Sequence, residues 1–236
     1  MTNLFELPKP ASIAISKQPD LFFPVNRIYC IGLNYTAHAQ EIYQSTEKAK
    51  TFFFFTKPKD AILHNHQSIE CPMKTTSFQH EVELVIAIGK PGKCISAENA
   101  EQHIYGFATG IDFTRRDLQK HLSKSGLPWD AGKVFDGSAA ISSITPLSAT
   151  GGIITKGAIR LKVNGTTKQQ ADISQMLFNI RAIIAELSQY NPLRQGDIIY
   201  TGTPQGTSNL KPGDKITAHI DGLEDLNISV CLPEPV

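Results

Sequence analysis

The sequence lacks several features that would assign it to a specialised class of protein. Its four cysteines are scattered over 236 residues without any C-x-x-C pair, so neither a disulfide framework nor a structural zinc site is predicted. No apolar run approaches the roughly 20 residues that span a bilayer. The first 20 residues contain neither a basic start nor a continuous apolar stretch. We therefore expect a cytoplasmic protein with no membrane partner.

An excess of one charge is also missing. The 23 basic residues nearly balance the 22 acidic ones, giving a formal net charge of +1. This balance gives no electrostatic reason to expect a nucleic acid or an anionic membrane as partner, so a small-molecule ligand is the better expectation. With 41% hydrophobic residues and no internal repeat, the chain is expected to form one globular domain over 1–236, in which 1–26 are a short N-terminal extension.

Short β-strands dominate the predicted secondary structure, because proline and glycine punctuate short apolar segments. The predicted strands are 27–32, 52–56, 82–89, 105–111, 158–164, 197–201, 215–220 and 226–231. Helices are expected at 174–189 behind a cap at Ser174, after Asp112 with Thr114 and Asp117 as a capping pair, and at 34–44. The glycine- and serine-rich residues 124–157 are predicted to form long loops, which usually serve function.

Two carboxylates on one face of a predicted strand pose the main chemical question of the sequence. In "FQHEVELVIAIGK" (78–90), a period of two places Glu81 and Glu83 on the same face as the apolar Val85 and Ala87. The two carboxylates would lie about 6–7 Å apart along the strand, where each raises the cost of ionising the other. This arrangement predicts a positive charge between them.

A third carboxylate suggests that this charge is a metal ion. Asp112 ends the apolar segment "YGFATGID", where a strand gives way to a helix at the rim of a sheet. Together with Glu81 and Glu83, it forms an all-oxygen set suited to Mg²⁺ or Mn²⁺. The alternative is that the two glutamates lie on the solvated face of an edge strand and that Asp112 only caps a helix. That alternative leaves the apolar continuation of the same face unexplained.

Several motifs together resemble one known family in order and spacing over most of the chain. They are "IYCIGLNYTAHAQE" (28–41), "FTKP" (55–58), "HEVELVIAIGK" (80–90), "GIDFTRRDLQ" (110–119), "GLPWDAGKVFDGSAAIS" (126–142), "LKVNGTTKQ" (161–169) and "GDIIYTGTPQG" (196–206). The chain resembles the fumarylacetoacetate hydrolase family, in particular its short single-domain branch. The resemblance implies a β-rich α+β fold, a mixed β-sandwich roll with a few short helices, and a homodimer.

The same resemblance implies a metal site and its surroundings. Glu81, Glu83 and Asp112 would hold Mg²⁺ or Mn²⁺, and Lys133 would enter the pocket as a compact positive charge able to hold an enolate or carboxylate oxygen. Thr203, in the turn "TGTP", would donate its hydroxyl and a backbone N–H to a substrate carboxylate. Taken alone, Lys133 can equally be a solvated lysine and "TGTP" an ordinary turn.

The segment from Asn34 to Glu41 is expected, from the resemblance, to form a mobile lid with Asn34 as a substrate-binding residue. His38 and Glu41 lie three apart on a short helix, where the carboxylate can orient the imidazole as a general base for water. Without the resemblance to this family, His38 and Glu41 would be interpreted as a histidine and a glutamate on the protein surface. Arg116 and Gln119, also three apart, are expected to face the substrate, although Arg116 can equally be a solvated cation.

The function predicted from these residues is a metal-dependent hydrolase that cleaves the C–C bond of short 2,4-dioxo acids to give pyruvate and a carboxylate. Its substrate would be a small 2-oxo acid that chelates the metal. An oxaloacetate decarboxylase or keto–enol isomerase on the same site is the nearer alternative, and a non-catalytic, metal-braced binding module is the more distant one. Gln79 occupies a position where the family often has histidine, and His80 is a candidate neighbour of the metal ligands.

Overall fold

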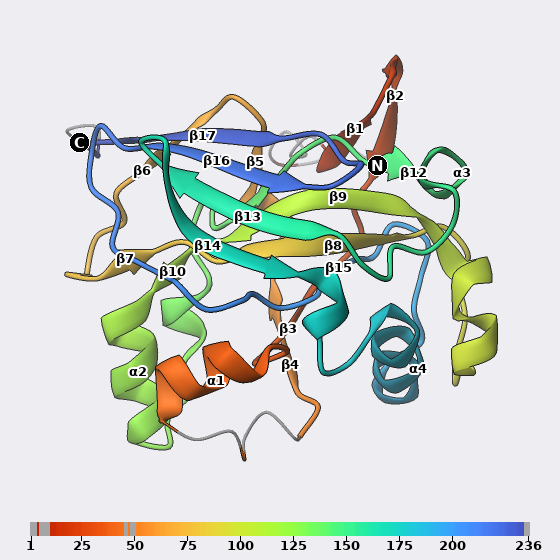
Figure 1. Ribbon diagram of the computed structural model, residues 1–236, viewed down its shortest axis with the longest axis horizontal. Coiled ribbons are helices and arrows are strands. Elements are labelled where there is room, and N and C mark those ends of the chain that lie inside the picture. Colours follow the sequence, from red (N-terminus) through yellow and green to blue (C-terminus); the bar gives the residue numbers. More distant parts are fainter. Residues whose placement is uncertain (1–3, 5–9, 45–46, 48–50, 234–236) are drawn as a thin grey trace.

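Two β-sheets packed face to face form the body of the molecule (Figure 1). The computed structural model describes residues 4, 10–44, 47 and 51–233. The larger sheet has eight strands in the order β4-β3-β15-β8-β9-β11-β5, with β12 paired to β9. Its strands are β3 (Ile28–Ile31), β4 (Phe54–Lys57), β5 (Ile62–His64), β8 (Val82–Ile88), β9 (Ile104–Asp112), β11 (Ala139–Ile141), β12 (Thr145–Pro146) and β15 (Ile198–Tyr200).

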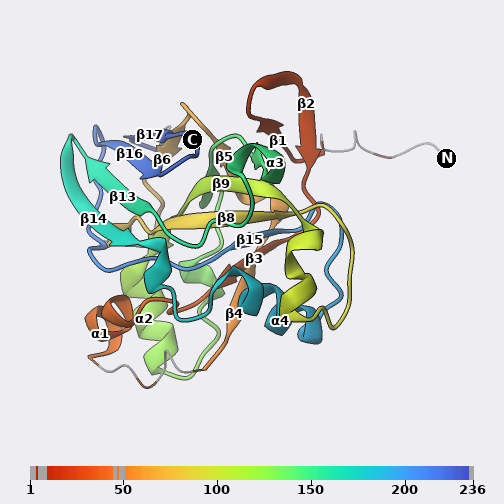
Figure 2. The same ribbon diagram turned by 45° about the vertical axis from the view of Figure 1, so that its right-hand side comes forward.

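The smaller sheet has five strands in the order β14-β13-β16-β17-β6 and lies against β8 and β9 (Figure 1). Its strands are β6 (Ser68–Glu70), β13 (Ala158–Val163), β14 (Thr166–Asp172), β16 (Lys215–Ile220) and β17 (Leu226–Cys231). Two further pairs are the hairpin β1 (Ser12–Ile15) with β2 (Gln18–Pro24), which projects from the body in Figure 2, and β7 (Phe78–Gln79) with β10 (Thr114–Arg115). This architecture confirms the predicted β-rich sandwich.

The described residues also form four α-helices: α1 (Thr36–Tyr43), α2 (Arg116–Lys124), α3 (Leu147–Thr150) and α4 (Ile180–Tyr190). The first two lie side by side in both views, whereas α4 is at the other end of the larger sheet (Figures 1 and 2). Within the described part of the chain, no helix has the length and apolar character that crossing a membrane requires.

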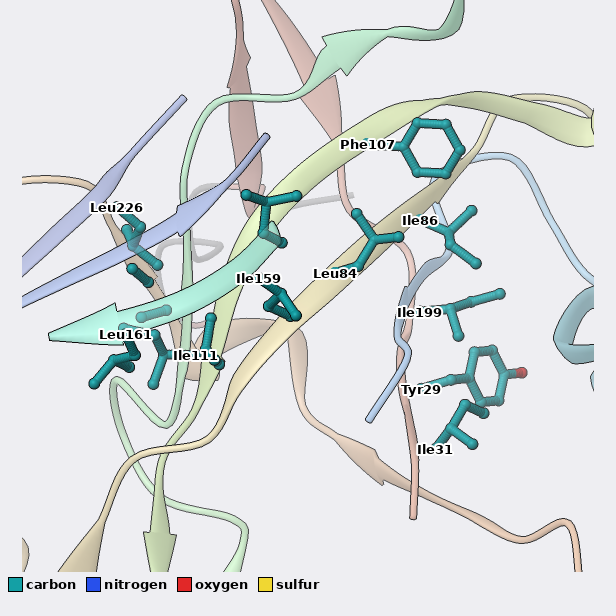
Figure 3. Packing of buried hydrophobic residues seen from close by; sticks show 14 of the residues in the cluster. Tyr29, Ile31, Leu84, Ile86, Phe107, Ile111, Ile159, Leu161, Ile199 and Leu226 are labelled. Atoms are coloured by element: carbon teal, nitrogen blue, oxygen red, sulfur yellow. The ribbon is translucent and has the colours of Figure 1, made fainter. Parts of the chain in front are cut away.

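The main hydrophobic core fills the space between the two sheets, as Figure 3 shows. Alternation along β8 sends Leu84 and Ile86 into this core, to which Ile159 and Leu161 of the smaller sheet also belong; Figure 3 shows Leu84 next to Ile159. The opposite face of β8 is also buried, because Val85 belongs to a second cluster that includes the β1–β2 hairpin. Since β8 lies between β15 and β9, the reading of Glu81 and Glu83 as a solvated edge-strand face is wrong.

All eight predicted strands are present within two residues of their expected bounds. The structure adds strands that the pattern did not reveal. The segment 124–157 contains β11 and β12 as well as loops, because a three-residue strand such as β11 is too short to show a period. Strand β14 (TTKQQAD) lies at an edge and exposes most of its polar residues, so it lacks apolar alternation. Of the predicted N-terminal extension, residues 1–3 and 5–9 lie outside the described residues.

The predicted helix caps are wrong at two places. Helix α4 begins at Ile180, where the Asn179 side chain accepts from the backbone N–H of Ala182, and not at Ser174, which lies in a separate 3-10 turn. Thr114 belongs to β10, and the Asp117 carboxylate accepts hydrogen bonds from Thr75 and Thr76 as well as from Leu118 N. Helix α4 therefore starts at a different local cap, whereas at α2 the tertiary contacts of Asp117 with Thr75 and Thr76 replace the predicted capping pair.

Candidate functional site

Strand register brings the three predicted carboxylates together. Antiparallel pairing of β8 with β9 places Val82 opposite Ile111, and Asp112 N donates to the Glu81 carbonyl at 2.9 Å. Asp112 at the end of β9 therefore lies beside Glu81 and Glu83, and carboxylate oxygens of the three residues lie within 4.8 Å of one another. All three side chains are buried.

Three buried cations surround these carboxylates. Lys133 Nζ donates to Glu81 Oε2 and to Asp112 Oδ2, both at 2.7 Å. Arg116 forms an ion pair with Glu81 Oε1. Lys57 Nζ lies 2.9 Å from Asp112 Oδ1 and donates to the Lys133 carbonyl oxygen. Lys57, at the end of β4, was not identified from the sequence, although it lies in the motif "FTKP". A lysine at the end of a strand rich in phenylalanine was the signal that could have indicated a buried cation.

The pKa values follow this pairing. Burial opposes ionisation of Glu81, but Lys133 and Arg116 together hold the pKa of Glu81 below its usual range. No cation among the described residues forms an ion pair with Glu83, whose Oε2 accepts the N–H of Gly202 at 2.6 Å. Burial, together with the neighbouring Asp112 and Glu81, raises the pKa of Glu83 well above its usual range. Burial lowers the pKa of Lys133, but the attraction of Asp112 and Glu81 outweighs it and raises that pKa overall.

The donor set fits a hard divalent cation. Carboxylate oxygens are the ligands that Mg²⁺ and Mn²⁺ prefer. One of them, Asp112 Oδ1, is buried and accepts no hydrogen bond from any described residue, because the Lys57 ammonium beside it is not aligned for one. Glu83, whose ionisation is unfavourable where it stands, would be stabilised by added positive charge. Glu81, Glu83 and Asp112 can thus hold the ion.

Helix α1 brings His38 and Glu41 over the carboxylates. His38 Nδ1 lies 3.1 Å from Glu41 Oε2, and His38 Nε2 lies 3.9 Å from Glu81 Oε1. The other oxygen of Glu41 accepts from the backbone N–H of Gly206 at 3.1 Å. Burial raises the pKa of the Glu41 carboxyl, but the hydrogen bonds from His38 and Gly206 lower it overall. An ionised Glu41 only accepts hydrogen bonds, so Nδ1–H is the donor in this contact, and Nε2 is the imidazole nitrogen on the side of Glu81.

Helix α2 contributes Arg116 and Gln119, both buried at the cavity, so Arg116 is not a solvated cation. The guanidinium is held at three nitrogens. Its Nε donates to Gln79 Oε1 at 3.0 Å, Nη1 donates to Gln119 Oε1 at 2.8 Å, and Nη2 pairs with Glu81. Gln79, where the family often has histidine, therefore supplies a neutral acceptor that adds no charge to the cluster.

The turn after β15 places Thr203 among the residues that line the cavity. Asn34 is placed differently. Its amide donates to the carbonyl oxygens of Phe178 and Thr201 and accepts from Phe178 N, and it is not among the described residues that line the cavity. Asn34 thus connects the start of the segment 34–41 to this turn. Gly202, at a φ of 94°, is required here, because a Cβ would come within 2.6 Å of the Asn34 Cβ.

The cavity above the carboxylates has a volume of about 360 Å³, in the range of small-molecule sites. Charged residues line it together with apolar and aromatic ones, which include Ile42, Phe53, Phe55 and Trp129 and are here called the aromatic wall. The Phe55 and Trp129 rings meet edge to face, with centroids 5.1 Å apart. The sequence analysis did not identify these residues as lining the site, although Phe55 and Trp129 lie within two of the quoted motifs.

His80 does not contact the carboxylates, which corrects the expectation that it neighbours the metal ligands. Its imidazole points to the opposite side of the chain, where Nδ1 lies 2.9 Å from Gln169 Oε1 and Nε2 lies 2.9 Å from Ser208 Oγ. Burial lowers the pKa of His80 to about 4, so the imidazole is neutral at neutral pH.

Comparison with known proteins connects this geometry to named relatives. Residues 27–231 match the family model "Fumarylacetoacetate (FAA) hydrolase C-terminal". A fumarylpyruvate hydrolase of Ralstonia sp is 41% identical over 187 residues, covering 79% of this chain and 95% of that protein. The oxaloacetate tautomerase YcgM of Escherichia coli (strain K12) is 33% identical over 202 residues, covering 86% and 91% of the two chains.

The solved structures agree with the sequence relatives. The crystal structure of a fumarylpyruvate hydrolase from Pseudomonas aeruginosa in complex with Mn²⁺ and pyruvate superposes with a TM-score of 0.94. The two sequences are 39% identical, and the match covers 98% of this chain and 100% of the other.

The carboxylate cluster predicts that Glu83→Gln will abolish tight binding of Mn²⁺. We expect the affinity to fall at least roughly 100-fold, because even outer-shell partners of a metal are worth roughly 10- to 100-fold. Isothermal titration calorimetry with Mn²⁺ measures it. Glu70→Gln, the same change at an exposed position in the smaller sheet, is the control and should bind like the wild type. Unchanged affinity in Glu83→Gln would contradict the assignment.

The buried ion pairs predict a structural cost for losing Lys57. Lys57→Met removes one of the two cations that pair with Asp112. Removing one partner of a buried ion pair lowers the free energy of unfolding by about 3–5 kcal/mol. Urea unfolding measures the loss. Lys59→Met, two residues away and exposed, should stay within about 0.5 kcal/mol of the wild type. Equal stability of the two variants would show that Lys57 is not part of the charge balance.

Proposed function

The chain belongs to the fumarylacetoacetate hydrolase family, and on this basis we propose that it is a metal-dependent hydrolase of short 2,4-dioxo acids. It cleaves their C–C bond to release pyruvate and a carboxylate. The observation that carries the proposal is the His38–Glu41 pair beside the three carboxylates, in which Nδ1 contacts Glu41 and Nε2 lies on the side of Glu81. A fumarylpyruvate hydrolase among the relatives and the pyruvate complex of a similar structure support it.

Glu81, Glu83 and Asp112 hold Mg²⁺ or Mn²⁺ in this proposal. When bound, the ion polarises the 2-keto oxygen of the substrate and stabilises negative charge that develops there. The side chains of the protein move the proton and bind the substrate. His38 Nε2 takes a proton from water, and Glu41, bonded to Nδ1, stabilises the imidazolium that forms. Glu41 is itself held by the Gly206 N–H, so the general base is oriented only while α1 lies over the turn.

The C–C bond breaks after water attacks the substrate. The oxygen of water bonds to the distal carbonyl carbon, and the bond between that carbon and the adjacent CH₂ breaks. The bonding electrons pass into the enolate of pyruvate, whose carbon accepts the proton that His38 took from water; this gives the keto acid and restores the imidazole. Lys133, with its ammonium already placed between Glu81 and Asp112, supplies positive charge next to the enolate oxygen. Thr203, together with Arg116 held by Gln119, binds the substrate oxygens.

A second candidate function is the tautomerisation or decarboxylation of oxaloacetate. The relatives named oxaloacetate tautomerase, at 33–36% identity, favour it. Both reactions pass through the same pyruvate-type enolate and use the same charged residues of the cavity. They differ from hydrolysis at one point only, because neither needs a water molecule to be activated for attack on a carbonyl.

This difference predicts a selective effect of His38→Ala. General-base assistance is typically worth about 10²–10⁴ in rate, so kcat for acetylpyruvate and fumarylpyruvate should fall by that order, while Mn²⁺ affinity stays close to that of the wild type. Decarboxylation of oxaloacetate, followed in the same preparations, should lose much less. His121→Ala, on an exposed position of α2, is the control.

Two results would overturn the assignment of hydrolysis. One is full hydrolytic activity in His38→Ala. The other is a wild-type protein that turns over oxaloacetate but neither acylpyruvate, in which case the second candidate takes its place.

We propose further that the protein assembles as a homodimer, on the strength of the family resemblance alone. The expected mass by light scattering at micromolar concentration is twice the 25.9 kDa of one chain. A mass of 25.9 kDa over the whole concentration range would refute this assembly.

A further inference from the structure

Gln169, on the smaller sheet, reaches the cavity side of the larger sheet. It is a fully buried residue in the middle of β14, a strand whose neighbouring residues are exposed. The pairing of β14 with β13 shifts there: Leu161 faces Gln169, whereas Lys162 faces Thr167, so Lys168 is left without a partner. This bulge redirects the strand locally.

The orientation of the Gln169 amide is determined by two backbone groups. Oε1 accepts the N–H of Val82 at 3.1 Å, and Nε2 donates to the carbonyl oxygen of Pro204 at 2.8 Å. If the amide were flipped, its NH₂ group would face the N–H of Val82 and its oxygen would face the carbonyl oxygen of Pro204. The positions of the amide oxygen and nitrogen are therefore assigned without ambiguity. Every other hydrogen bond of this amide then has a fixed direction.

The fixed amide determines the direction of the Thr203 hydroxyl. Gln169 Nε2 lies 2.9 Å from Thr203 Oγ1 and is the donor. The hydroxyl oxygen accepts this bond, so its own proton must point elsewhere. No described residue accepts it, and Thr203 lines the cavity. The proton is therefore available to a substrate oxygen.

The other end of the amide extends the chain of hydrogen bonds. Oε1 can only accept, so His80 Nδ1 is the donor across their 2.9 Å contact. The neutral imidazole then accepts at Nε2 from the Ser208 hydroxyl. Donors consequently run in one direction, from Ser208 through His80 and Gln169 to Thr203.

We propose that Gln169 is a positioning residue, which acts through Thr203 by forcing that hydroxyl to donate to the carboxylate of a bound 2-oxo acid. The inference rests on the proposed function, because it requires a 2-oxo acid in the cavity. Glutamate at position 169 retains the acceptor for Val82 and His80 but replaces the donor by a second acceptor. The Thr203 proton would then turn toward residue 169 and be lost to the substrate.

Pyruvate binding tests the inference separately from catalysis. The probe is pyruvate titrated into the Mn²⁺-loaded protein, followed by the fluorescence of Trp129, the single tryptophan, which lines the cavity. We expect Gln169→Glu to weaken pyruvate binding roughly 10- to 100-fold, the value of a hydrogen bond to a charged group. KM for an acylpyruvate should rise by a similar factor, with kcat changing less.

A double-mutant cycle decides whether the effect passes through Thr203. Thr203→Val should weaken pyruvate binding as much as Gln169→Glu does, and the double variant should be no weaker than either. If Gln169→Glu weakens pyruvate binding by the same factor in the Thr203→Val variant as in the wild type, the new carboxylate acts by charge repulsion. That result would overturn the inference.

Thr203→Ser keeps the hydroxyl and should bind like the wild type. If Gln169→Glu does not fold, as judged by its thermal transition, the comparison of Thr203→Ser with Thr203→Val still decides: equal binding by these two overturns the inference. A wild-type protein that does not bind pyruvate at all would instead contradict the proposed function itself.

Discussion

The charge balance at the end of β8 and β9 is the constraint on which the rest of the site depends. Three buried carboxylates would be prohibitively unfavourable alone, because desolvation penalises each charge and each carboxylate repels the others. Lys57, Lys133 and Arg116 offset that cost by direct pairing. The balance is uneven, since among the described residues Glu83 receives only a backbone N–H. This uneven pairing makes the cluster both stable enough to fold and receptive to a divalent cation.

The two sheets have different tasks in the site. The larger sheet carries the charged residues at the ends of its central strands, where register fixes their spacing. The smaller sheet supplies the hydrophobic surface that buries one face of β8, and through Gln169 it also reaches the Thr203 turn. Helix α1 completes the site from outside, because Glu41 links His38 to Gly206. His38 and the turn that follows β15 are thus connected through Glu41.

Family membership and cavity shape explain different aspects of function. The charged residues of the cavity match a chemistry that hydrolases and tautomerases of the family share, in which an enolate is stabilised. Phe53, Phe55 and Trp129 line the same cavity, and the Lys133 ammonium lies 5.2 Å from the centroid of the Phe55 ring. In the proposed function, these aromatic residues would pack against the acyl part of the substrate, whereas the buried charges would stabilise the enolate.

The sequence by itself determined the strands, through their period of two, and the metal-binding set, because Glu81 and Glu83 share a strand face and Asp112 ends the next strand. The order of the motifs indicated the family. The resemblance then identified further candidate site residues: His38, Glu41, Lys133, Arg116, Gln119 and Thr203. Only the tertiary structure showed that Lys57 pairs with Asp112 and that Asn34 connects the start of the segment 34–41 to Phe178 and Thr201. It alone revealed the hydrogen bonds from His80 to Thr203. The physical reason is that these features depend on contacts between residues far apart in the chain, and no local pattern encodes such partners.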